Sequence, residues 1–380
     1  MTSRVTNWFG VIASALFVIW APEACRAQQV KPTIEQILRV WKGRQEKATS
    51  VRFDLRSEKT IHKGSNSFIV NLERRREGSN QLEPNPPRDY IVQGTREVRI
   101  SGQKLRYTCD FEQWDPNGKK LYRQHYIDVF DGKLYKYLRN PASGLEDHPT
   151  GGVTKANASQ SHLKFPIIPL IWTFRGSHPQ FFSNLEKFEL TGQTLTVGRR
   201  PCLELMLDSK DNRRREMLYI DQERDYVVVK EVILVEDKPK WQVDATYAHD
   251  ANVGWVPRSW EYIIRVGKEG RMFESGRMTV SSYVINPQTV DDEFDIAFPP
   301  RTRVNDKSSE VDVQYIMLDN GKKGREIPTT ANPSYEDLQK PPKQINRWAL
   351  ITIWSFLFML ALSIWIWLQL RRKGQKTQES

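Results

Sequence analysis

Apolar and polar residues alternate along most of this chain, and this period of two constrains the fold more than any other feature. Val51, Phe53 and Leu55, for example, are separated by polar neighbours. Because side chains two residues apart share one face of a strand, each such stretch predicts a strand with one apolar face. The period recurs at 68–73, 96–111, 121–130, 133–138, 194–207, 216–221, 226–235, 241–247, 255–266 and 277–285.

Turn residues separate these stretches. Pro116-Asn117-Gly118, Asp131-Gly132 and Gly198 lie between alternating runs, and Asn-Gly or Asp-Gly in that position is a strong hairpin signal. Strands joined by short turns form an antiparallel meander, which is able to keep one face wet and the other apolar. The sequence therefore predicts a mainly β (α+β) domain built on one antiparallel sheet.

An amphipathic helix precedes the strands, at residues 33–48. Thr33 is a good N-cap, and Gln36 completes a capping box. The apolar residues that follow repeat at helical spacing, so one face of the helix must lie against an apolar surface. They are Ile34, Ile37, Leu38 and Trp41.

The stretch 161–190 breaks the strand pattern. Residues 165–172 are dense in apolar side chains and contain Pro166 and Pro169. Proline is favoured in the first turn of a helix, so we expect a helix from Pro169 through Phe174 that covers the sheet as a lid. The alternative is a connecting loop whose apolar residues fill the core.

The two ends of the chain predict an exported, anchored protein. Residues 1–27 have the pattern of a signal peptide, with Arg4, the apolar run from Trp8 to Ala21, and small residues before a cut at Gln28. The alternative is a lipoprotein signal acylated at Cys25. Near the other end, Trp348 to Leu370 is uncharged, and at 1.5 Å per residue it would form a helix of roughly 34 Å, long enough to cross a bilayer.

These segments divide the chain. We expect a signal peptide at 1–27, a domain at 28–305, a polar tether with prolines at 306–346, one transmembrane helix at 347–370 and a tail at 371–380. The signal peptide sets the orientation: the domain lies outside the cytoplasm, in the periplasm, and the C-terminus lies inside. The net charge of +11 comes partly from the signal and anchor segments, so the domain is only mildly basic and we expect no nucleic-acid partner.

Two cysteines remain after cleavage, Cys109 and Cys202. A disulfide is permitted outside the cytoplasm, but spacing does not show whether the two approach each other. Two separate buried thiols are the alternative.

Known catalytic and metal-binding patterns are absent from the sequence. None of the six histidines has a partner at metal-ligand spacing, and no H-E-x-x-H, G-x-S-x-G, P-loop or C-x-x-C motif occurs. We therefore expect no catalytic residue, no metal and no cofactor, and a protein that is not an enzyme.

Several short motifs are similar to a known family. They are the T-I-x-Q-I-L start of the first helix, 129–135 (VFDGKLY), 218–221 (LYID) followed by a valine-rich strand, and 294–299 (FDIAFP). Together with the signal peptide and the meander, they resemble the periplasmic lipoprotein-carrier superfamily of LolA-, LppX- and RseB-like proteins. The resemblance covers about 30–304. It implies an incomplete β-barrel, a curved antiparallel sheet whose apolar concave side is covered by helices and holds acyl chains or an apolar peptide.

The predicted anchor departs from that family, since a carrier that crosses the periplasm is soluble. We expect a tethered domain that binds lipid or lipoprotein acyl chains without a covalent step, between the sheet and the lid. The alternative is a regulatory, envelope-stress interaction protein that acts through another membrane protein. The residues expected to line the cavity are Ile37, Leu38, Trp41, Ile168, Leu170 and Trp172.

Overall fold

A computed structural model describes most of the chain outside its ends. The described residues are 32–65, 86–115, 119–140, 148–155, 161–176, 187–209, 213–267, 270–339 and 354–365. The signal peptide, the predicted strand at 68–73, the turn at 116–118 and the tail at 371–380 lie outside them.

The first helix is confirmed. Helix α2 spans Ile34–Lys47. The Thr33 hydroxyl accepts a hydrogen bond from the backbone N–H of Gln36, and the Gln36 side chain accepts one from the backbone N–H of Thr33, at 3.3 and 3.0 Å. This reciprocal pair satisfies two of the donors that a helix leaves unpaired at its start.

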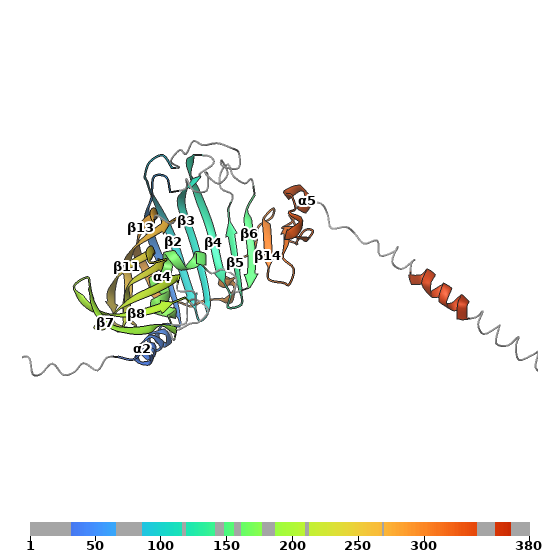
Figure 1. The fold of residues 1–380 in the computed structure, drawn as a ribbon. Helices are drawn as coiled ribbons and strands as arrows, with labels where there is room; N and C mark the ends of the chain where they lie inside the picture. Colours follow the sequence, from blue (N-terminus) through green and yellow to red (C-terminus); the bar gives the residue numbers. More distant parts are fainter. Residues whose placement is uncertain are drawn as a thin grey trace, which may run out of the picture.

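The described strands form one large curved sheet, so the mainly β prediction is confirmed (Figure 1). Its centre consists of two antiparallel meanders joined where β1 pairs with β13. The first meander comprises β1 (Ser50–Ile61), β2 (Tyr90–Ser101), β3 (Lys104–Asp115), β4 (Lys120–Phe130), β5 (Leu134–Arg139) and β6 (Thr150–Lys155). The second comprises β7 (Glu189–Val197), β8 (Arg200–Asp208), β9 (Arg214–Asp221), β10 (Val227–Val235), β11 (Lys238–Asp250), β12 (Gly254–Val266) and β13 (Arg271–Ile285).

Two of the predicted stretches each contain a hairpin. The stretch 96–111 covers the end of β2 and the start of β3, which are joined at Gly102, and 194–207 divides into β7 and β8 at Gly198. Both glycines have a positive φ, 53° and 56°, which glycine adopts without steric cost. The alternation continues through such a short turn, so periodicity alone does not reveal it.

Three inward-facing glycines each lie directly opposite an aromatic residue on the next strand. The pairs are Gly94 with Phe111, Gly152 with Tyr137, and Gly276 with Tyr262. A Cβ on Gly276 would lie 2.8 Å from the Tyr262 ring and 2.8 Å from the carbonyl oxygen of Glu58. Glycine therefore lets the strands approach closely, and the opposing ring covers the backbone, a combination that introduces curvature into sheets.

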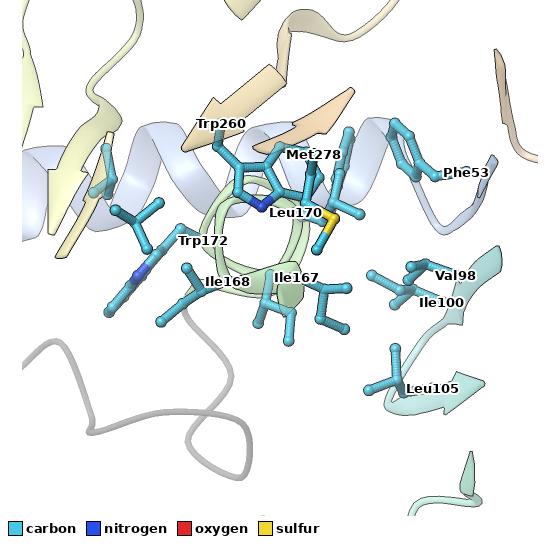
Figure 2. Close-up of a cluster of buried hydrophobic side chains, with 14 of the residues drawn as sticks. Phe53, Val98, Ile100, Leu105, Ile167, Ile168, Leu170, Trp172, Trp260 and Met278 are labelled. Atoms are coloured by element: carbon cyan, nitrogen blue, oxygen red, sulfur yellow. The ribbon is translucent and has the colours of Figure 1, made fainter. Parts of the chain in front are cut away.

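Helices α2 and α4 lie against one face of the sheet, which we call the inner face. Helix α4 (Ser161–Arg175) contacts β10, β12 and α2. It begins earlier than the predicted Pro169, and both prolines lie inside it. Buried side chains of the two helices and of the inner strand faces form one main hydrophobic core (Figure 2).

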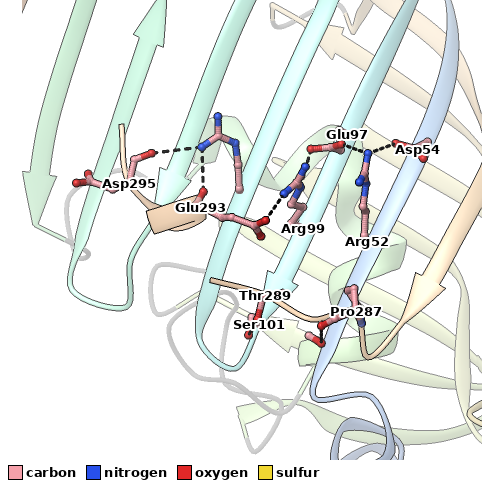
Figure 3. Close-up of polar contacts among 11 residues, drawn as sticks. Arg52, Asp54, Glu97, Arg99, Ser101, Pro287, Thr289, Glu293 and Asp295 are labelled. Atoms are coloured by element: carbon pink, nitrogen blue, oxygen red, sulfur yellow. Dashed lines mark hydrogen bonds and ion pairs between the residues drawn. The ribbon is translucent and has the colours of Figure 1, made fainter. Parts of the chain in front are cut away.

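The chain after β13 crosses the opposite, outer face. Segment 286–302 runs over β1 to β5 and contains the short 3-10 helix η2 (Asp291–Phe294). Phe294 and Ile296 bury Val129 and Leu138 on the outer side of β4 and β5. Polar contacts fix the same segment (Figure 3): Arg99 pairs with the Glu293 carboxylate at 2.8 Å, and Ser50 Oγ donates to the Pro287 carbonyl at 3.0 Å.

After this crossing the chain extends the sheet. β14 (Arg303–Lys307) pairs in parallel with β6, and β15 (Val313–Ile316) and β16 (Ile327–Pro328) follow it outward. The 3-10 helix η3 (Thr329–Ala331) and helix α5 (Tyr335–Gln339) end this part. The predicted tether begins at residue 306, whereas in the structure strands and short helices continue to Gln339. Val304 and Tyr315 are buried with Val153 there.

The predicted anchor is only partly described. Residues 354–365 are helical, with exposed side chains throughout, and the rest of 347–370 lies outside the described residues. Within the described parts of the chain, no helix is both long enough and apolar enough to span a bilayer.

Candidate functional site

The structure brings the six predicted lining residues together. Ile37 and Trp41 on α2 and Ile168, Leu170 and Trp172 on α4 are each at most 2% exposed, and Leu38 is half-buried. Trp41 and Trp172 meet at a centroid distance of 5.7 Å and an angle of 57°, a tilted geometry typical of favourable aromatic pairs. The helices therefore contact each other as well as the sheet.

Polar contacts hold both helices at their ends. On α2, Trp41 Nε1 donates to the carbonyl of Tyr226 at 2.7 Å, and Arg44 donates to the carbonyl of Asp225 at 2.6 Å. On α4, Arg175 donates to the carbonyls of Gly102 and Thr49 at 2.5 and 2.8 Å. Burial lowers the pKa of Arg175 to about 10, so its guanidinium remains charged at neutral pH and supplies strong hydrogen bonds.

A small hollow lies beneath α4 among the described residues. A hollow of about 10 Å³ lies between the helix and strands β10 and β11, lined by Ile168, Trp172 and Val243 among others. That volume suits about one water molecule, whereas small-molecule pockets start near roughly 300 Å³. In this structure the helix and the sheet pack directly on each other.

A larger hollow lies on the outer face. It is a groove of about 760 Å³ across β13, β1, β2 and β3. Its charged lining consists of three arginines and three carboxylates: Arg56, Arg123, Arg277, Glu58, Asp110 and Glu112. Arg123 and Asp110 form an ion pair at 2.7 Å. The groove is thus polar and charge-balanced, which suits a hydrophilic ligand better than an acyl chain.

A third feature, missed by sequence reasoning, is a set of buried charges on the inner face, which we call the inner cluster: Lys59, Arg96, Glu274, Tyr107 and Tyr262. Lys59 Nζ lies 3.2 Å from Glu274, and the Tyr262 hydroxyl donates to the same carboxylate at 2.7 Å. Burial lowers the pKa of Lys59, and the Glu274 carboxylate opposes that effect.

Arg96 is held differently. It is 6% exposed, and its Nη1 donates to the Tyr107 hydroxyl. Its Nε is buried without a hydrogen-bond acceptor, and among the described residues no carboxylate forms an ion pair with it. The sequence signal was available: Arg96 lies in register with Val98 and Ile100, at an inward position of the alternation.

Next to this cluster lies a buried acid, Asp128 on β4. It accepts a hydrogen bond from the Tyr135 hydroxyl. Burial raises the pKa of Asp128 to about 6, and the Tyr135 hydrogen bond limits that rise. This carboxyl group therefore titrates within the range of ordinary buffers.

The two cysteines are free thiols on opposite faces of the sheet. Cys109 faces the main core with Tyr107, whereas Cys202 packs with Val227 and Tyr247 on the other side. Burial raises the pKa of both, that of Cys202 to about 11. The alternative of two separate buried thiols is the one found here.

Comparison with known proteins assigns no family. No family model matches the chain, and no curated protein matches its sequence. Among solved structures, a DUF1329 family protein from Desulfovibrio piger superposes with a TM-score of 0.41 at 10% identity, over 69% of this chain and 95% of that one.

Two other superpositions are looser. PNGF-II gives a TM-score of 0.24 at 7% identity, over 69% of this chain and 32% of PNGF-II. A porin-like protein from Bacteroides uniformis gives 0.20 at 9% identity, over 62% of this chain and 98% of that one. Scores this low support no inference about function, and the resemblance to the lipoprotein-carrier superfamily stays a prediction.

Proposed function

We propose that this protein is a membrane-anchored, periplasm-facing domain that binds lipid or lipoprotein acyl chains between α4 and the inner face of the sheet. Binding is non-covalent, and the driving force is burial of the chain, at about 0.8 kcal/mol for each CH₂ group. A signal peptide and an anchor, both predicted from the sequence, would keep this domain within reach of a bilayer that supplies such chains.

The observation that best supports this proposal is the composition of the α4 interface. Ile168, Leu170 and Trp172 face the apolar side chains of α2 and of the inner strands (Figure 2). An acyl chain that enters this interface replaces contacts between α4 and the sheet with apolar contacts of its own. These new contacts largely offset the free energy lost when the helix packing is opened. Because the remaining hollow is about 10 Å³, α4 has to move away from the sheet when the ligand enters.

The test uses the full-length protein purified in a neutral detergent. Mass spectrometry of a solvent extract should show co-purified lipid, and a fluorescent fatty acid should bind with an emission shift. Ile168→Phe adds bulk under α4 and should weaken binding, while Ile91→Phe, at an exposed position, serves as the matched control. If neither co-purified lipid nor fatty-acid binding is found, the proposal fails.

A second candidate function, regulation through another membrane protein, is favoured by the outer groove. Its three arginines and three carboxylates match an extended polar segment of a protein partner better than they match a lipid. Crosslinking in membranes distinguishes the two functions: a stoichiometric partner that crosslinks next to Arg56 or Arg277, together with an empty inner face, would favour regulation.

A further inference from the structure

Arg96 is a buried cation that forms no ion pair with any carboxylate in the part of the chain that the structure describes. Arginine stays protonated at any physiological pH, so it does not escape the cost of burial by losing its proton. Burying an unpaired ion is costly, and proteins nearly always pair it or hydrogen-bond it fully. Among the described residues Arg96 donates one hydrogen bond, to the Tyr107 hydroxyl, and its Nε has no acceptor there.

A second cation, Lys59, lies near Arg96 and adds to the positive charge of the inner cluster. Lys59 and Arg96 both face the Phe111 ring, with 4.4 Å from Nζ and 5.6 Å from Cζ to the ring centroid. Glu274 neutralises one of these cations. Within the described part of the inner cluster, two cations therefore share one carboxylate, and a net positive charge remains in an apolar interior.

The position of Arg96 in the sheet brings its charge close to the proposed binding site under α4. Arg96 lies directly opposite Leu55 on β1 and Cys109 on β3. Val98 and Ile100 lie two and four residues beyond Arg96 on β2, in the direction of the helices. Both belong to the same hydrophobic core as α4. An acyl chain lying along these strands under α4 would bring its polar end to the guanidinium.

We propose that Arg96, with Lys59 beside it, binds the anionic head, a carboxylate or a phosphate, of an amphiphile whose chain occupies the interface under α4. This inference rests on the proposed function and names its ligand class. Arg96 Nε is the free donor, and a second guanidinium N–H completes the two-point contact that arginine makes with such oxyanions. Tyr107 orients the guanidinium and does not need to contact the ligand.

The test compares two ligands of equal chain length on the full-length protein in neutral detergent, radiolabelled palmitate and hexadecanol. Wild type should bind palmitate at least about tenfold more tightly, as expected for a charge-assisted contact in an apolar site. Arg96→Met should remove that preference and leave hexadecanol binding within about twofold. Arg52→Met, which removes an arginine from the outer face of the neighbouring strand β1 and lies outside the outer groove, should keep the preference.

Thermal unfolding without ligand controls for folding. Replacement of an unpaired buried charge by an apolar side chain should leave the melting temperature of Arg96→Met equal to or above that of wild type. A clear fall would identify Arg96 as a structural residue and contradict the proposal. Arg96→Lys, which keeps the charge and loses the two-point contact, should retain part of the preference for palmitate.

The outcomes separate this inference from the proposed function. If palmitate and hexadecanol bind wild type equally, acyl binding stands and the headgroup site is overturned. If neither binds, the proposed function itself fails. If inorganic phosphate alone stabilises wild type but not Arg96→Met, and palmitate has no advantage, the site binds a free anion and the headgroup assignment is overturned.

Discussion

The two faces of strands β1 to β4 both carry charged side chains, but they hold them differently. On the outer face Arg52 and Arg99 contact Glu97 at 2.6 and 2.7 Å in a partly exposed network (Figure 3). On the inner face Lys59 has one carboxylate, and Arg96 has a phenol and an unpaired Nε. On the outer face these arginines have a carboxylate partner, and because the pairs are partly exposed they contribute little to stability. On the inner face the burial of charge costs free energy, and in the described part of the chain the two cations have one carboxylate between them. A buried cation without a carboxylate partner among the described residues is the feature that suggests an anionic ligand.

The largest difference in stability should be found between substitutions of an inward-facing and an outward-facing residue of β1. Phe53 is fully buried and contacts Phe174 of α4 at a centroid distance of 5.5 Å. Phe53→Ala should lower the free energy of unfolding by about 3–5 kcal/mol. Arg56→Ala, on the exposed side of the same strand, should change it by less than about 0.5 kcal/mol. Urea denaturation measures both values, and similar losses for the two variants would contradict this assignment of faces.

Removal of one carboxylate from each face should give the next largest difference. Glu274→Gln leaves Lys59 beside Arg96 without a counter-charge, and we expect a loss of about 2–3 kcal/mol because Glu274 is mostly buried. Glu97→Gln should cost less than about 1 kcal/mol, as for other surface ion pairs. Equal costs in urea denaturation would mean that the inner pair is solvated.

The pH dependence should come from Asp128. Its pKa is raised to about 6 in the folded protein and lies near 3.9 in an unfolded chain. Between these values the folded state binds the extra proton, so the contribution of Asp128 to stability should fall as the pH rises from about 4 to 6 and then stay level. Asp128→Asn should lack that fall and be more stable than wild type at pH 7 by about 1–3 kcal/mol. A variant with the same pH profile as wild type would contradict the shift.

The smallest effect should come from reduction. Because Cys109 and Cys202 are free and lie on opposite faces, a reducing agent should leave the melting temperature unchanged. Loss of a native disulfide would instead cost about 2–5 kcal/mol. A marked fall on reduction would show that the two thiols are bonded.

Much of the sheet could be predicted from the sequence, because its determinants are local. Alternation located the described strands up to residue 285 except β6, which no predicted stretch covers. Thr33 with Gln36 fixed the start of α2. The hairpin at Gly102 was merged into one longer stretch, since alternation continues through a tight turn. Gly198 was recognised as a turn residue, although the stretch 194–207 was drawn across it. The strands β14 to β16 are short, and β14 joins the sheet through parallel pairing with β6, a contact that no local pattern encodes.

The site was predictable only in part. Ile37, Trp41, Ile168 and Leu170 follow from apolar spacing, and the structure brings them together. The inner cluster does not follow from spacing, because a charged residue at an inward position looks like a break in the strand pattern. The role of such a charge depends on the partners that the fold brings to it, and in the inner cluster these residues come from β1, β2, β3, β12 and β13.

The seam between the two meanders sets the order in which this protein is able to fold. Along each meander, strands pair with their neighbours in sequence, and such local contacts form early. The seam instead pairs Val51 with Ile285, and its formation requires closure of a very long loop, which is slow. On a ribosome that makes the N-terminus first, β1 and β6 both present open edges until β13 and β14 have been synthesised. A chain stopped before residue 271 therefore leaves the edges of β1, β6 and β12 unpaired, and such edges are the surfaces through which β proteins aggregate.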